Sequence, residues 1–86
     1  MTSETASAAE LDEIIAALRA GHTVQLGGQQ SSDNLGYRDG GFVSDWRDNG
    51  NTGTDEVTEA QVRARLQGWS RPTIERILAT VRAPRT

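Results

Sequence analysis

The spacing of apolar residues predicts an amphipathic helix near the start of the chain. Apolar side chains recur there at positions i, i+3, i+4 and i+7, on one helical face; they are Leu11, Ile14, Ile15 and Leu18. Ser7 and Glu10 have the spacing of a capping box, and Gly21 stands where a left-handed residue would close the helix. We therefore expect a helix over residues 8–20 and a disordered tail over residues 1–6.

The apolar period then changes to two, which predicts strands. Residues 22–26 alternate around Val24 and Leu26, and the Asp39-Gly40-Gly41 turn separates two further candidate strands, 35–38 and 42–47. Residues 27–34 are predicted as a loop or a loosely paired strand extension, and residues 48–56 as a polar loop. Alternation places Phe42, Ser44 and Trp46 on the sheet face that we expect to meet the helices.

Two helices are predicted after the strands. Thr58 and Gln61 form a second capping box, and Val57 and Val62 occupy the positions of a hydrophobic staple. Gly68 ends this helix, and Trp69 falls in the turn that follows. Ser70-Arg71-Pro72 opens the last helix, which Ala83-Pro84 stops and whose apolar stripe is Ile74, Ile77, Leu78 and Val81.

The order of elements predicts an α+β fold. It comprises an N-terminal helix, a two- to three-stranded antiparallel meander and two C-terminal helices packed on one sheet face, because each apolar face must be buried against another. The domain is expected to span residues 7–83 of the 86-residue chain. The sequence has no cysteine and no run of about 18 apolar residues, and its start lacks the features of a secretory signal. A cytoplasmic location is therefore expected.

Charge is unevenly distributed along the chain. Residues 1–62 hold eleven acids and three arginines, a net charge of −8, whereas residues 63–86 hold six arginines and one acid, a net charge of +5. This split suggests either that one half binds a charged partner or that the two halves neutralise one another within the fold.

The arginine-rich segment, Val62 to Ile77, resembles a DNA-binding helix-turn-helix. The resemblance lies in Ala64, in Gly68 in the turn, and in the run from Ser70 to Ile74 that opens the second helix. It implies that the second helix would enter the major groove, with contacts from Ser70, Arg71, Thr73 and Arg76. The segment departs from the family pattern because Arg63 and Gln67 stand where that family has apolar residues.

The segment Asp45 to Glu56 partly fits the calcium-binding loop of an EF-hand. Asp45, Asn49, Gly50 and Glu56 match its first, fifth, sixth and twelfth positions. Arg47 falls at the third position, where a calcium ion needs an oxygen ligand, and the preceding residues have a strand pattern. We therefore expect no metal and no other cofactor, and an exposed acidic loop here.

No catalytic set is recognisable around the single histidine, His22, so we expect a protein that is not an enzyme. The leading hypothesis is a small regulator or inhibitor that masks another protein through an acidic sheet edge and loop; basic sites that normally bind nucleic acid are among the surfaces it could cover. Its candidate contact residues are Asp39, Asp45, Trp46, Asp48, Asp55 and Glu56. The alternative is a small DNA-binding regulator using residues 59–82. The sequence leaves open whether Trp46 and Trp69 are core or interface residues, and in which oligomeric state the chain acts.

Overall fold

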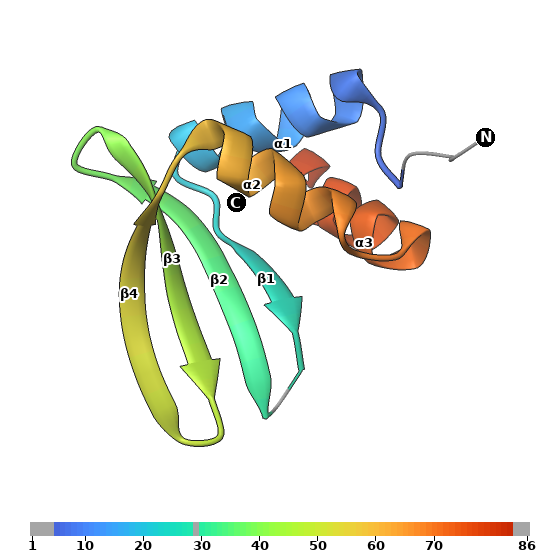
Figure 1. Ribbon diagram of the computed structural model, residues 1–86. Helices are drawn as coiled ribbons and strands as arrows, with labels where there is room; N and C mark the ends of the chain where they lie inside the picture. The colour runs from blue at the N-terminus through green and yellow to red at the C-terminus, as the bar shows by residue number, and fades with distance from the viewer. Residues whose placement is uncertain (1–4, 29, 84–86) are drawn as a thin grey trace.

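The computed structural model describes residues 5–28 and 30–83. Within them three helices cover one face of a four-stranded antiparallel sheet whose strand order is β1-β2-β3-β4 (Figure 1). The elements in chain order are α1 (Ala8–Arg19), β1 (Val24–Gly27), β2 (Ser31–Arg38), β3 (Gly41–Asp48), β4 (Asn51–Val57), α2 (Glu59–Gln67) and α3 (Arg71–Arg82). The predicted α+β class is confirmed, with four strands in place of the two or three expected.

Capping boxes fix where α1 and α2 begin. The Ser7 hydroxyl accepts a hydrogen bond from the Glu10 backbone N–H (3.1 Å), and the Glu10 carboxylate accepts one from the Ser7 N–H (2.9 Å). Thr58 and Gln61 form the same reciprocal pair at 3.1 and 2.8 Å. Each cap stabilises its helix by about 1 kcal/mol because it satisfies backbone donors that have no partner inside the helix. Both predicted helix starts are confirmed.

Two tight turns shape the meander. Asp39 and Gly40 (φ 55° and 80°) join β2 to β3, and Asn49 and Gly50 (φ 49° and 88°) join β3 to β4. Positive φ at both central residues is the geometry of a type I′ hairpin turn, whose twist matches that of the strands. The hairpin predicted at Asp39-Gly40 is confirmed.

The polar loop predicted over residues 48–56 is wrong. Residues 51–57 form β4, which pairs with β3 from Asp48↔Asn51 to Phe42↔Val57. The strand was missed because it lies at the sheet edge and six of its seven side chains are polar or glycine, so no apolar alternation marks it. Of residues 27–34, Gly27 ends β1 and residues 31–34 pair as the first half of β2, which agrees with the expected strand extension, while residue 29 lies outside the described residues.

The core lies between the helices and the sheet face that they cover, called here the inner face. Phe42 and Ser44 of β3 are buried on this face together with Leu35 of β2, as the alternation predicted. The helices contribute the predicted stripes, including Ile14, Leu66 and Ile74. None of the three described helices lies on the opposite, open face of the sheet (Figure 1).

The core also includes a residue of the chain ahead of α1. Of the predicted tail, residues 1–4 lie outside the described residues, but Ala6 is fully buried in the core. Its N–H donates to the Gln67 side chain (3.0 Å), whose amide nitrogen in turn donates to the Ala6 carbonyl (2.7 Å). Gln67 therefore anchors the chain ahead of α1 to the end of α2.

Candidate functional site

Strand β4 is the uncovered edge of the sheet. Asp48 and Asn51 flank a two-residue turn, so they form a hydrogen-bonded pair. Hydrogen-bonded and non-hydrogen-bonded pairs alternate along an antiparallel ladder. The backbone N–H and C=O groups of Thr52, Thr54 and Glu56 therefore point away from β3. Within the described residues no backbone or side-chain partner meets these groups. Such a row of free donors and acceptors is able to pair with another strand.

The other edge strand, β1, is shorter and partly covered. It has four residues, and Arg76 of α3 donates to the Gln25 carbonyl at 3.3 Å. Residues of α3, among them Arg76 and Ile77, line a hollow together with Val24 and Gln25. The sheet therefore offers a long accessible edge at β4 rather than at β1.

Trp46 packs directly on the backbone of the edge strand. Its cross-strand partner is Gly53, and a β-carbon added there would lie 2.4 Å from the indole Cζ2 and 2.6 Å from Cε2. The indole therefore occupies the space that a side chain at position 53 would need. Trp46 is half-buried, as is Trp69 in the turn between α2 and α3, and both line a hollow of about 410 Å³.

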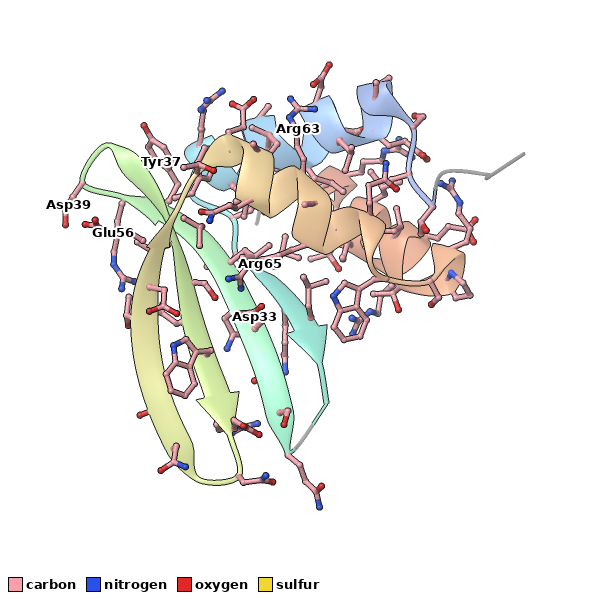
Figure 2. The ribbon with its side chains drawn as sticks, in the orientation of Figure 1. Asp33, Tyr37, Asp39, Glu56, Arg63 and Arg65 are labelled. Carbon is pink, nitrogen blue, oxygen red and sulfur yellow. The ribbon has the colours of Figure 1, made fainter. Side chains whose placement is uncertain are left out.

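A polar network lies on the inner face next to this hollow. Arg65 of α2 donates to Asp33 (Nη1 to Oδ2, 2.5 Å) and to the Ser44 hydroxyl (3.2 Å), and Ser44 in turn donates to Asp33. Figure 2 shows Arg65 and Asp33 pointing toward one another from helix and sheet. Asp33 and Arg65 also line the hollow, so its wall combines indole rings with a neutralised ion pair.

Sequence reasoning missed this network, although a signal was present. Alternation places Asp33 on the same face as Leu35, and Ser44 on the same face as Phe42. Polar residues beside the buried Leu35 and Phe42 on this face imply a polar partner from the covering helix, because a buried polar group must be hydrogen-bonded. Arg65, next to the buried Leu66, supplies that partner.

The six candidate contact residues do not form one continuous surface. Trp46, Asp48 and Asp55 line the same hollow beneath the helices. Asp39 and Glu56 lie near one another at the opposite end of the sheet (Figure 2), where both line a second hollow. Asp45 lies on the open face and is engaged by neighbouring side chains.

The carboxylate of Asp45 is neutralised within the fold. Both terminal nitrogens of Arg38 donate to it (3.0 and 3.1 Å), as does the Thr54 hydroxyl (2.6 Å). These bonds, the one from Arg38 first, hold the pKa of Asp45 below its ordinary value. Asp45 is therefore less available to a partner than Asp55 or Glu56.

Five carboxylates form no ion pair within residues 5–28 and 30–83. Four of them belong to the strands and turns from β2 to β4, and one, Glu75, lies on α3. The four are Asp39, Asp48, Asp55 and Glu56, and of these Asp48 accepts a hydrogen bond from the Ser31 hydroxyl (2.7 Å). Among the described residues, the carboxylates outside ion pairs therefore gather in β3, in β4 and in the turn before β3.

In the helical layer, by contrast, arginines of α2 and α3 are paired with acids of α1. Arg71 donates both terminal nitrogens to Glu10 (2.6 and 2.7 Å). These bonds are the main cause of a Glu10 pKa of about 2, against an ordinary value of 4.5, with the Ser7 N–H contributing next. Further pairs join Arg63 to Asp12 and Arg82 to Glu13. The charge split along the sequence is thus largely neutralised inside the fold.

The residues implied by the helix-turn-helix resemblance lie at the start of α3. The hydroxyls of Ser70 and Thr73 are hydrogen-bonded to each other at 3.2 Å, and Arg76 is exposed. Arg71, besides its bonds to Glu10, donates to the Thr5 carbonyl at 3.0 Å. The chain ahead of α1 therefore lies against the turn of α3 that would have to face DNA.

The segment that partly fits an EF-hand calcium loop, residues 45–56, is part of the sheet. Residues 45–56 form an extended hairpin rather than a loop that could wrap around an ion, and the described part of the chain holds no group of three metal-ligating side chains. None of the described helices has the length and apolar character needed to span a membrane.

Comparisons with known proteins add no family to this description. Neither the scan against protein-family models nor the searches of curated proteins and of solved structures gave a match.

Proposed function

We propose that this protein is a non-enzymatic, protein-binding regulator that masks a basic partner through the acidic edge strand β4. One observation carries the proposal: the strand whose outward backbone groups can form new main-chain hydrogen bonds also holds carboxylates that have no ion pair among the described residues. Asp55 and Glu56 stand in β4 itself, on its inner and open sides respectively.

A partner with a positively charged surface fits this edge. Complementary charge raises association rates and rejects like-charged competitors, while the buried centre of an interface supplies most of the affinity. Trp46 and Trp69 lie beside the acidic edge and are half-buried, so a partner that covers β4 would bury more of both indoles. A basic surface that otherwise binds nucleic acid is one such partner.

DNA binding through α2 and α3 is the alternative function. In its favour, Arg76 and Ser70 are exposed on α3. Against it, Arg71 would have to leave Glu10 before contacting phosphate, at the loss of two charge-assisted hydrogen bonds. We therefore favour the acidic edge.

A charge-reversal experiment tests the proposal. The tagged protein is used to capture partners from an extract of its native cells, in parallel with the double variant Asp55→Lys plus Glu56→Lys. Glu75→Lys, which reverses the charge at an exposed position of α3, is the matched control. The proposal predicts that the capture of a basic protein is lost in the double variant and kept in the control, with both variants folded by circular dichroism.

A titration with duplex DNA at two salt concentrations tests the alternative. Binding that weakens steeply with salt and disappears in Arg71→Ala plus Arg76→Ala would favour the DNA-binding function, because released counterions give such binding its salt dependence.

In the capture experiment, equal capture by the wild type and by Asp55→Lys plus Glu56→Lys would contradict the proposed function.

A further inference from the structure

We infer that β4 binds its partner by strand addition: an extended, basic segment of the partner pairs with β4 as a fifth strand and contacts Trp46 beside Gly53. This inference rests on the proposed function and specifies the form of its partner.

The backbone of β4 selects the pairing positions. Thr52, Thr54 and Glu56 point their N–H and C=O groups away from β3, so an antiparallel fifth strand would exchange hydrogen bonds with these residues. Gly53 and Asp55 would then stand in the non-hydrogen-bonded pairs, whose α-carbons approach to about 4.5 Å. Side chains opposite Gly53 and Asp55 are therefore the closest to β4 and project from the inner face.

The side chains of β4 then define what the fifth strand must carry. A residue opposite Asp55 faces a carboxylate that has no ion pair among the described residues, which favours lysine or arginine. A residue opposite Glu56 faces a second such carboxylate on the open side. The partner segment should therefore place two adjacent basic residues here, one on each side of the sheet.

The lack of a side chain at Gly53 favours an apolar residue opposite it on the added strand. Since position 53 has no side chain, nothing on β4 screens the Trp46 indole that packs over it from a neighbouring strand. An apolar residue opposite Gly53 would lie against that ring and enter the hollow shared by Trp46 and Trp69. From the residue opposite Glu56 to the residue opposite Thr52, the partner segment is therefore basic, basic, polar, apolar, polar.

A second copy of this chain is a poorer occupant. When two β4 strands pair antiparallel with full overlap, Asp55 faces Gly53 and Glu56 faces Thr52 of the other copy. This pairing gives neither acid a cationic partner and brings the four carboxylates of the two β4 strands together, which opposes association. The charge of the edge therefore favours a basic segment of another protein.

Proline at an outward-facing position tests the inference. The probe is a capped peptide with the run arginine, lysine, threonine, leucine, threonine, and its control is a scrambled peptide of the same composition. Thr54→Pro removes an N–H that the added strand needs but that β3 does not use, a position where an edge strand tolerates proline. Thr54→Val is the matched variant, because it also loses the hydroxyl bond to Asp45 but keeps the N–H.

We expect the peptide to bind the wild type and Thr54→Val within a factor of about three, and Thr54→Pro roughly tenfold more weakly, measured by isothermal titration calorimetry. Thr52→Pro, at the second outward-facing position, should weaken binding in the same way and replaces Thr54→Pro if that variant does not fold. Equal binding by the proline and valine variants, equal binding of the scrambled peptide, or no binding to the wild type would overturn strand addition.

The capture experiment separates this failure from that of the proposed function. If Asp55→Lys plus Glu56→Lys abolishes capture of the partner while the proline variants retain it, the acidic edge binds but not by adding a strand. If neither change affects capture, both proposals fall.

Discussion

The indole of Trp46 lies on the backbone of Gly53, its cross-strand partner, so closely that position 53 has no room for a β-carbon. Cross-strand pairs in which an aromatic ring covers a glycine restore the packing that the glycine lacks. Here the pair also brings a large apolar ring to the free edge of the sheet. The same contact therefore stabilises β4 and exposes the ring to a neighbouring strand.

Gly53→Ala should destabilise the protein by about 1–3 kcal/mol, because the new methyl group displaces the indole ring. Denaturant unfolding measures the loss, and a shift in tryptophan emission would report the movement of the ring. Gly41→Ala is the control, since a β-carbon there meets nothing within 4 Å. Equal effects of the two substitutions would show that Trp46 does not pack on Gly53.

The ion pair between Asp33 and Arg65 should contribute more to stability than the one between Arg38 and Asp45. The Asp33 and Arg65 side chains are 28% and 35% exposed, whereas those of Arg38 and Asp45 are 54% and 44% exposed. Reduced exposure weakens solvent screening, and Ser44 adds hydrogen bonds to both partners. Double-mutant cycles with alanine should give a coupling of about 1–2 kcal/mol for Asp33 and Arg65, and below about 1 kcal/mol for Arg38 and Asp45. Equal couplings would contradict this ranking.

Stability should fall in acid through the contact between Glu10 and Arg71. The pKa of Glu10 is about 2 in the folded protein and 4.5 ordinarily, so this contact stabilises the fold fully above pH 4.5 and is lost as the pH falls toward 2. Arg71→Gln should raise the Glu10 pKa toward 4.5, measured by NMR titration of the carboxyl carbon, and flatten the dependence of stability on pH over this range. Arg76→Gln is the control, because Arg76 donates to the Gln25 carbonyl and forms no ion pair with an acid of the described residues. A Glu10 pKa unchanged by Arg71→Gln would contradict this assignment.

The sequence predicted the helices better than the sheet, for a physical reason. Each helix carries local signals, such as the Thr58–Gln61 capping box, that do not depend on distant residues. Strand β4 has no such signal, because an edge strand exposed on both sides needs no apolar alternation. The second turn, Asn49-Gly50, was the available clue, since Asn-Gly strongly favours a type I′ hairpin.

The site was less predictable than the fold because it depends on long-range pairing. The hydrogen bonds between Arg71 and Glu10 join residues 61 positions apart in the sequence. The bond from Arg65 to Asp33 joins residues 32 positions apart. Both contacts follow from the packing of distant segments. The sequence raised internal neutralisation of the two charged halves as one alternative, and the ion pairs between α1 and the C-terminal helices bear this alternative out. It could not show which acids would remain unpaired on β4.

Backbone amide hydrogen exchange, measured with and without the captured partner, tests the acidic-edge account most directly. Because Thr52, Thr54 and Glu56 direct their N–H groups away from β3, these amides should exchange rapidly in the free protein and slowly in the complex. The account predicts new protection at these three positions and little change at residues 70–76. New protection confined to residues 70–76, with the β4 amides still exchanging rapidly, would contradict it.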